Sequence, residues 1–298
     1  NLSDYKGAIE DYNKAIELTP QLAMTYAVRG ATYTQQKQYS QALTDLNKAI
    51  QLGDNNATTY ASRGEVYRLQ KQSTSALADY TTAIQLDPKY VDAYNDRGTI
   101  YADLQQYPEA LADYTKSLQI NPQYLNGYNN RGNLYIAQQQ YSLALADFNK
   151  LLQLDPKYAN GYNNRGVVYF VQKQYALSLA DCNKAIQLDP QNAIAYINRG
   201  EIYYEMGEPN KAIQAWQQSI AIDSKFAESK LALAVALFTQ GKQAQAYVTA
   251  EGAIGLDKNL AKIQYLKEQN WGDRLLVDAQ KLLDAMRMKA FTSRSNNR

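Results

Sequence analysis

The chain has 298 residues, with 31 basic and 29 acidic side chains, no histidine and one cysteine. The absence of histidine removes the commonest general base and zinc ligand, and one cysteine cannot form an internal disulfide or a paired-cysteine metal site. A net charge of +2 argues against a nucleic-acid-binding domain, and no apolar run approaches the roughly 18 residues that span a bilayer. We therefore expect no enzyme, no cofactor, no metal, no nucleic-acid partner and no membrane insertion.

The chain is built from a repeat of 34 residues. Arg-Gly dipeptides recur six times at this interval, from 29–30 to 199–200. A partial repeat fills 1–22, seven full repeats fill 23–260, and a tail of 38 residues fills 261–298. A fixed period of this length indicates a solenoid, with no residues left for a second domain. Positions 1 to 34 are numbered below from the repeat starts Ala23, Ala57, Val91, Leu125, Ala159, Ala193 and Ala227.

The partial first repeat has the pattern of a single helix over residues 1–18. Ile9, Tyr12 and Ile16 fall on one apolar face of it. The opening helix of this repeat is missing, so we expect further sequence upstream. The uncovered face is a candidate surface for self-association, which predicts a homo-oligomer formed through this helix.

Each full repeat predicts a helical hairpin. Positions 4, 7, 8 and 11 read Tyr-x-x-Arg-Gly-x-x-Tyr in six successive repeats, a spacing that places all four residues on one helical face. Small or aromatic residues at positions 20, 24 and 27 form the apolar stripe of a second helix. Proline at position 32, as in Pro88 and Pro156, ends that helix.

The pattern resembles the tetratricopeptide repeat in its NRG-type variant. The family pattern of aromatic, Gly, Tyr, Ala, aromatic, Ala and Pro at positions 4, 8, 11, 20, 24, 27 and 32 is matched by Tyr162, Gly166, Tyr169, Ser178, Cys182, Ala185 and Pro190. The resemblance implies an all-α, right-handed superhelical solenoid whose first helices line a concave groove. It also implies binding of a protein or peptide segment without catalysis. The Gln-, Asn- and Tyr-rich composition resembles bacterial members, which predicts a soluble protein of the cytoplasm or periplasm.

Arginine at position 7 departs from the family, which usually has an apolar residue there. Aspartate occupies position 23 from Asp11 to Asp181, and then Ala215 follows. Pairing each aspartate with the arginine of the next repeat matches Ala215 with Leu233, where both charges are lost together. We therefore expect salt bridges between repeats, such as Asp11–Arg29 and Asp45–Arg63.

Asparagine gathers at the positions that line the groove in this family, namely 2, 5, 6, 9, 12 and 13 of the first helix. Asparagine is a mediocre helix former, so its accumulation there needs a reason. A carboxamide both donates and accepts, and can therefore hold the backbone of an extended chain. The alternative is a merely solvated face. The predicted peptide-binding asparagines are Asn95, Asn126, Asn129, Asn130, Asn133, Asn160, Asn163, Asn164 and Asn198.

Other groove positions are acidic or apolar. Asp92 and Glu201 belong to an acidic set that favours basic or neutral partner segments. Phe170, Ile197 and Tyr204 belong to an apolar set that needs a cover, supplied by a helical partner segment or by the chain's own tail.

The tail, residues 261–298, predicts capping helices and a short flexible end. Residues 273–288 form an amphipathic pattern containing Leu275, Leu276, Leu282 and Leu283. Solenoids need a cap over the apolar side of the last repeat, so we favour capping over partial insertion into the groove.

These observations predict a non-catalytic interaction scaffold that binds an extended or helical partner segment for assembly or adaptor roles. The alternatives are the substrate-presenting arm of a larger enzyme and a self-associating module.

Overall fold

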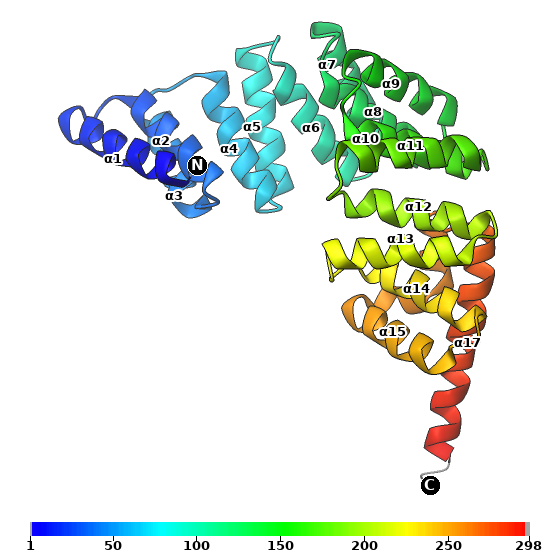
Figure 1. Ribbon diagram of the computed structural model, residues 1–298. Coiled ribbons are helices and arrows are strands. Elements are labelled where there is room, and N and C mark those ends of the chain that lie inside the picture. The colour runs from blue at the N-terminus through cyan, green and yellow to red at the C-terminus, as the bar shows by residue number, and fades with distance from the viewer. Residues whose placement is uncertain (1, 296–298) are drawn as a thin grey trace. The chain divides into compact units, whose positions relative to one another are not determined.

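The computed structural model describes residues 2–295, with side chains described for residues 5–289. Those residues form seventeen α-helices and one short 3-10 helix, with no strand (Figure 1). None of the described helices is long and apolar enough to cross a membrane. The chain divides into two compact parts, residues 1–139 and residues 140–298, which we call the N-terminal half and the C-terminal half.

The N-terminal half alternates first and second helices of the 34-residue repeat. It opens with α1, which has the register of a second helix. In chain order its helices are α1 (Leu2–Leu18), α2 (Ala23–Gln35), α3 (Tyr39–Gln51), α4 (Ala57–Leu69), α5 (Ser73–Leu86), α6 (Val91–Asp103), α7 (Tyr107–Ile120) and α8 (Leu125–Ala137). The paired helices of each repeat, such as α2 and α3, make the most extensive contacts.

The C-terminal half continues the alternation and ends with the tail. Its repeat helices are α9 (Tyr141–Leu154), α10 (Ala159–Val171), α11 (Tyr175–Leu188), α12 (Ala193–Glu205), α13 (Pro209–Ile222), α14 (Ala227–Thr239) and α15 (Gln243–Leu256). The tail contains η1 (Lys258–Ala261), α16 (Ile263–Glu268) and α17 (Asp273–Ser295). Residues 273–295 are therefore helical beyond the predicted end at 288, and the last part of the predicted flexible end, 296–298, lies outside the described residues.

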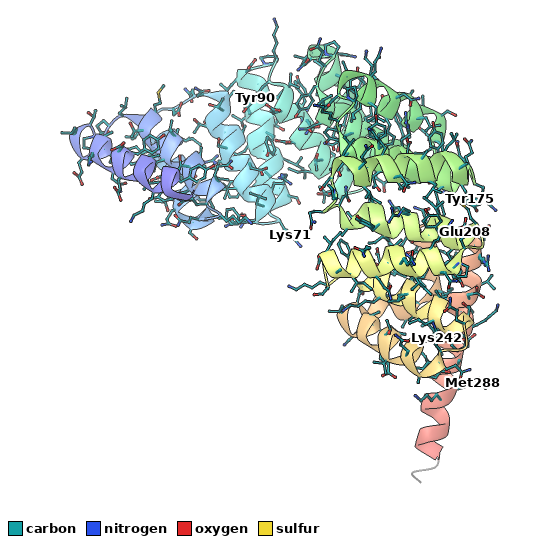
Figure 2. The ribbon with its side chains drawn as sticks, viewed as in Figure 1. Lys71, Tyr90, Tyr175, Glu208, Lys242 and Met288 are labelled. Carbon is teal, nitrogen blue, oxygen red and sulfur yellow. The ribbon has the colours of Figure 1, made fainter. Side chains whose placement is uncertain are left out.

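The turn between first and second helices has the same backbone conformation in every full repeat. Position 15 adopts a positive φ, and it is a non-glycine residue in five of the repeats, such as Lys37 (φ 59°) and Lys71 (φ 59°). The Gln38 amide donates to the Tyr33 carbonyl at 2.9 Å, which caps the first helix. Lys71, Glu208 and Lys242 mark three of these turns in Figure 2.

Second helices end on an aspartate side chain. In Asp87, Asp155 and Asp189 the carboxylate accepts a hydrogen bond of 2.9–3.0 Å from the backbone N–H two residues further on. Proline follows each of them at position 32. This turn closes the repeat because the proline cannot continue the helix.

Small residues bring the two helices of a repeat together. Position 20 of the second helix is fully buried in all seven repeats: Ala42, Ala76, Ala110, Ala144, Ser178, Ala212 and Ala246. Glycine at position 8 of the first helix lies against it, and a Cβ on Gly30 would come within 3.1 Å of the Ala42 carbonyl oxygen. Glycine allows this close approach in six repeats, and the seventh has Ala234 at position 8.

The tail covers the end of the C-terminal half. Leu260, Leu266 and Leu275 have no exposed surface and share one cluster with Leu231 and Val235 of α14, which are also fully buried. Helix α17 contacts both α12 and α14, beside which it lies in Figure 1. The tail packs along α12 and α14, the first helices of the last two repeats, and covers apolar residues at their groove positions.

Candidate peptide-binding face

The arginines at position 7 pair within their own repeat, so the expected salt bridges between repeats are wrong. Arg29 donates from Nε and Nη2 to both carboxylate oxygens of Asp45 at 2.6 and 2.7 Å. The same two-bond geometry joins three further pairs at 2.7–2.8 Å: Arg63–Asp79, Arg97–Asp113 and Arg165–Asp181. Positions 7 and 23 face each other across the hairpin, which makes the partner the residue sixteen further on.

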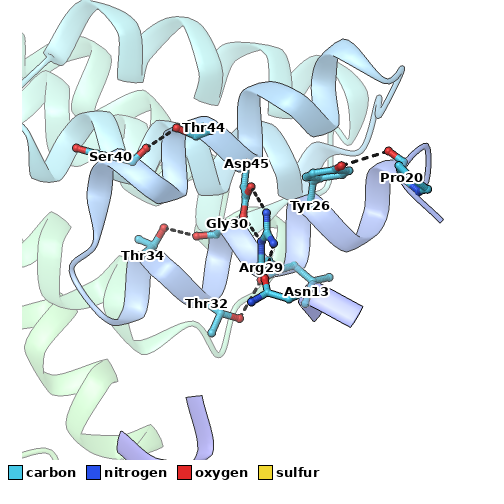
Figure 3. A network of polar contacts seen from close by, with 11 residues as sticks. Asn13, Pro20, Tyr26, Arg29, Gly30, Thr32, Thr34, Ser40, Thr44 and Asp45 are labelled. Atoms are coloured by element: carbon cyan, nitrogen blue, oxygen red, sulfur yellow. Dashed lines mark hydrogen bonds and ion pairs between the residues drawn. The ribbon is translucent and has the colours of Figure 1, made fainter. Parts of the chain in front are cut away.

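A different arginine nitrogen links successive repeats. Nη1 of Arg29 donates to the Asn13 amide oxygen at 2.5 Å, reaching position 25 of the preceding repeat (Figure 3). Asn47, Thr81, Thr115, Asn149 and Asn183 accept in the same way from the arginines that follow them. Neutral position 25, rather than charged position 23, is therefore the position through which the arginine contacts the preceding repeat.

Two tyrosines flank each of these guanidinium groups. The Arg29 guanidinium lies 5.7 Å from the centre of the Tyr26 ring and 5.9 Å from that of Tyr33. Four further arginines, at 63, 97, 131 and 165, have the same pair of ring contacts at 5.6–6.0 Å. Positions 4, 7, 11, 23 and 25 thus form one packed unit, which we call the arginine clamp.

The clamp is incomplete at Arg199. Its position-23 partner is Ala215, and its Nε is buried without a hydrogen-bond partner. Only the bond to Asn183, at 3.3 Å, and the contact with the Tyr196 ring, at 4.9 Å, remain. The joint loss of charge at Ala215 and Leu233 suggested the wrong pairing, because position 23 in the repeat of Leu233 is also uncharged, at Thr249.

First helices lie side by side on one face of each half. In the N-terminal half α2 contacts α4, α4 contacts α6, and α6 contacts α8. In the C-terminal half α10 contacts α12, and α12 contacts α14. A hollow of about 160 Å³ in the N-terminal half is lined from α2, α4 and α6 at positions that include 2, 5, 6, 9, 12 and 13, through residues such as Ser62, Glu65 and Asp96.

The asparagines of the N-terminal half are bonded to one another. Asn130 donates to the Asn95 amide oxygen at 2.9 Å, and Asn129 donates to Asn130 at 3.1 Å. Asn95 is 4% exposed and donates in turn to Asp96 at 3.1 Å. Position 6 of one repeat is thereby tied to position 5 of the repeat before it.

The C-terminal half repeats this link. Asn198 donates to the Asn163 oxygen at 2.9 Å, and Asn163 is 6% exposed. In both links the position 5 side chain, Asn95 or Asn163, is buried. The position 6 asparagines, including Asn164, are half-buried. The remaining predicted asparagines are exposed: Asn126, Asn133 and Asn160, the last of which accepts a bond from Asn192.

Acidic side chains in the N-terminal hollow all have partners. Glu65 binds Arg68 through two hydrogen bonds of 2.7 and 2.8 Å, and Asp92, which is exposed, accepts from the Tyr124 hydroxyl at 2.7 Å. Burial raises the pKa of Asp96 to about 6, and repulsion from Glu65 and Asp92 adds to the effect, against the hydrogen bond from Asn95. The hollow attracts positive charge.

The C-terminal half contains a more enclosed cavity of about 120 Å³. Its lining includes Val167 and Phe170 from α10 and Ile197, Asn198 and Glu201 from α12, so that four predicted site residues meet here. Glu228 of α14 and the tail segment Gln269, Asn270 and Trp271 complete the wall. These tail residues were not among the predicted site residues, although a tryptophan inside the polar run 267–273 is a signal for a covered contact.

Two predicted residues of this half differ in accessibility. Phe170 is half-buried and stacks at 5.7 Å against Tyr175, one of the residues labelled in Figure 2. Tyr204 is 1% exposed, and its hydroxyl donates a hydrogen bond of 2.7 Å to the Asp278 carboxylate of α17. Tyr204 was predicted to contact a bound peptide, and of the two covers that the sequence allowed it is the tail that lies over this residue.

Glu201 has no hydrogen-bond or ion-pair partner among the described residues; it is half-buried and lines the cavity. Burial raises its pKa to about 8, with repulsion from Glu228 and Glu205 acting in the same direction. Burial likewise raises the pKa of the Glu228 carboxyl, to which Asp257 contributes.

Family models match most of the chain. A TPR repeat model matches residues 30–71, 64–105 and 132–173, and a tetratricopeptide repeat model matches 91–124, 159–192 and 193–226. A third model, also a tetratricopeptide repeat, matches residues 1–22. The chain belongs to the tetratricopeptide repeat (TPR) family. TPR repeats mediate protein–protein interactions on a fold that is typically non-catalytic.

Solved TPR structures share the fold. A tetratricopeptide repeat protein from Parabacteroides merdae is 21% identical with a TM-score of 0.68, covering 88% of this chain and 99% of that one. PilF of Pseudomonas aeruginosa is 18% identical, with a TM-score of 0.62. The match covers 71% of this chain and 96% of that chain. YrrB, a TPR protein with an unusual peptide-binding site, is 24% identical, with a TM-score of 0.51. The match covers 63% of this chain and 96% of that chain.

The curated proteins contain no significant match. Within the described part of the chain, no three His, Cys, Asp or Glu side chains are grouped so as to hold a metal ion. Cys182 is fully buried, and burial raises its pKa to about 12, so it packs as an apolar residue.

Proposed function

We propose that this TPR protein is a non-catalytic scaffold that holds an extended segment of a partner protein along the face formed by its first helices. The observation that carries the proposal is the asparagine set of each half, on α6 and α8 in the N-terminal half and on α10 and α12 in the C-terminal half. Within each half the buried member, Asn95 or Asn163, is bonded to the next repeat, and the half-buried and exposed members present amide groups on the face formed by the first helices of that half. YrrB, which has the same fold, is described as having a peptide-binding site.

The bonded asparagines retain capacity for a ligand. These two hydrogen bonds use one donor and one acceptor site of the Asn130 carboxamide, which has two of each. Asn126 and Asn133 are exposed on the same helix. Backbone N–H and C=O groups of an extended chain match such donors and acceptors without regard to side-chain sequence.

The acidic residues that line the N-terminal hollow favour a basic or neutral partner segment. Glu65, Asp92 and Asp96 surround the hollow between α2, α4 and α6, and Arg68, a basic residue nearby, is already bonded to Glu65. An acidic segment would meet repulsion there, whereas a segment with lysine or arginine gains attraction that salt screens.

The test is selection from a library of displayed random 12-residue peptides, followed by measurement of affinity for the best binder. We expect the triple variant Asn126→Ala, Asn130→Ala, Asn133→Ala to weaken binding at least tenfold, since it removes three amides from one face. Asn95 and Asn163 are not replaced, because they are buried; Asn95 loses the hydrogen bond from Asn130, so circular dichroism must show that the triple variant is folded.

Gln119→Ala is the matched control, because it removes an exposed amide from the second helix α7. We expect it to bind as the unmodified protein does. Equal affinity of the triple variant and the control, with both folded by circular dichroism, contradicts the proposal, as does failure of the selection to enrich any peptide.

A further inference from the structure

We propose that the cavity lined by Glu201, Glu228, Phe170 and Trp271 is a binding site for a primary ammonium group on an unbranched alkyl chain, as presented by a lysine side chain of the bound segment. The lysine as the source of this ligand rests on the proposed function. The cavity's preference for an alkylammonium group does not, and it is tested separately.

Two carboxyl groups without a bonding partner line the cavity. Glu201 and Glu228 both line it, and neither has a hydrogen-bond or ion-pair partner in the part of the chain that the structure describes. The hollow of the N-terminal half is different, because there Glu65, Asp92 and Asp96 all have partners. Two carboxyl groups facing one small space repel each other unless they are protonated or share a cation.

The walls select the kind of cation. Phe170 and Trp271 present aromatic rings, which attract an ammonium group and also contact a methylene chain. Asn198, Gln269 and Asn270 supply amide groups to receive its N–H donors. A metal ion would need more oxygen ligands than these two carboxylates, and no cluster of three or more ligating groups is present in the described residues.

The volume of the cavity and its position beside a second hollow suit a short alkyl chain. The cavity measures about 120 Å³, and cavities of about 150 Å³ hold molecules the size of benzene. A second, more open hollow of about 310 Å³ shares Phe170, Asn270 and Trp271 with it. These three residues form the boundary between the two spaces, so a segment lying in the open hollow would reach the cavity with a side chain that passes them.

Protonation of Glu201 makes the binding dependent on pH. With its pKa raised to about 8, this carboxyl group is mostly protonated at pH 7, and an ammonium group stabilises the ionised form. Binding must then release a proton, and affinity rises with pH. The titratable groups around Glu201 are Glu205 on its own helix, Glu228 on α14 and Cys182 on α11, with Asp257 acting on Glu228.

The experiment titrates the whole chain with n-butylammonium chloride by calorimetry, with n-butanol as the neutral probe of the same length. We expect saturable binding of n-butylammonium at one site and none of n-butanol. Affinity should rise roughly tenfold from pH 6 to pH 7 and level off above pH 8. Glu201→Gln, which keeps shape without charge, should weaken binding at least tenfold, and Glu251→Gln, at an exposed site on α15, should leave it unchanged.

Equal binding by Glu201→Gln and the unmodified chain overturns the proposal, as do affinity independent of pH, equal binding of n-butanol, and the absence of saturable binding. A selected peptide that binds equally well with lysine or norleucine overturns the lysine source. If n-butylammonium binds but no displayed peptide does, the ammonium site stands and the proposed function fails.

Discussion

Arginine at position 7 determines how the repeats of this TPR protein are joined. Each guanidinium group binds an aspartate of its own hairpin, an asparagine or threonine of the preceding one, and two tyrosine rings. In Arg29 and Asp45 the side chains are 17% and 5% exposed. Arginine is suited to this site because its planar group binds a carboxylate through two parallel bonds while its faces contact rings.

Ala215→Asp should complete the clamp at Arg199. The substitution places a carboxylate opposite a buried Nε that has no partner. We expect the free energy of unfolding to increase by about 1 kcal/mol, because a charge-assisted bond replaces an unsatisfied donor. Urea unfolding of the variant measures this, with Ala215→Asn as the neutral control. A decrease in stability below that of Ala215→Asn would show that position 23 of this repeat cannot reach Arg199.

Glu201 should make stability depend on pH. Its pKa is about 8 in the folded chain and near the ordinary 4.5 in the unfolded chain, so the folded state holds more protons between these values. Stability is therefore lost as pH rises from about 5 to 8. The Glu201→Gln variant should lose less of its free energy of unfolding over this pH range, by a few kcal/mol. At pH 8.5 the variant should therefore be more stable than the unmodified chain. Thermal unfolding at pH 5.5 and 8.5 compares the two chains, and parallel losses would refute the assignment.

Within a hairpin, close packing of helices limits what position 8 accepts. A Cβ on Gly200 would overlap the fully buried Trp216 indole, whereas a Cβ on Gly166 would lie 3.3 Å from the Cys182 sulfur. We expect Gly200→Ala to cost about 2–3 kcal/mol and Gly166→Ala clearly less, because a buried indole cannot move aside. Denaturant unfolding ranks the two variants. Equal costs would indicate that backbone entropy, not packing, decides.

Helix α17 depends on a cap supplied by another helix. The Glu205 carboxylate of α12 accepts from the Arg274 and Leu275 amides at 3.2 and 3.0 Å. Glu205→Ala should weaken docking of α17 by about 1 kcal/mol. Hydrogen exchange should then be faster in the first turns of α17, whereas Glu208→Ala, which removes a carboxylate from the neighbouring turn, should leave it unchanged. Unaltered exchange in Glu205→Ala would exclude this role.

Over the whole chain, the period of 34 residues was sufficient to predict the helices and their order. Partners were harder to predict, since a spacing shows which residues share a face but not which neighbouring helix lies opposite; Arg29 was paired with Asp11 in place of Asp45 for this reason. Burial was also missed at Asn95 and Asn163, whose side chains look like surface groups until their bonds to the next repeat are seen. Contacts over long sequence separation, such as Tyr204 with Asp278, leave no local pattern.

The measurement that tests the binding face most directly is NMR of side-chain amide groups with the best selected peptide. The account predicts shifts of the Asn130 and Asn133 NH₂ signals on α8 at the same peptide concentrations, with the Gln119 signal on α7 unchanged. Peptide binding that shifts Gln119 and leaves the α8 asparagines unaffected would contradict it.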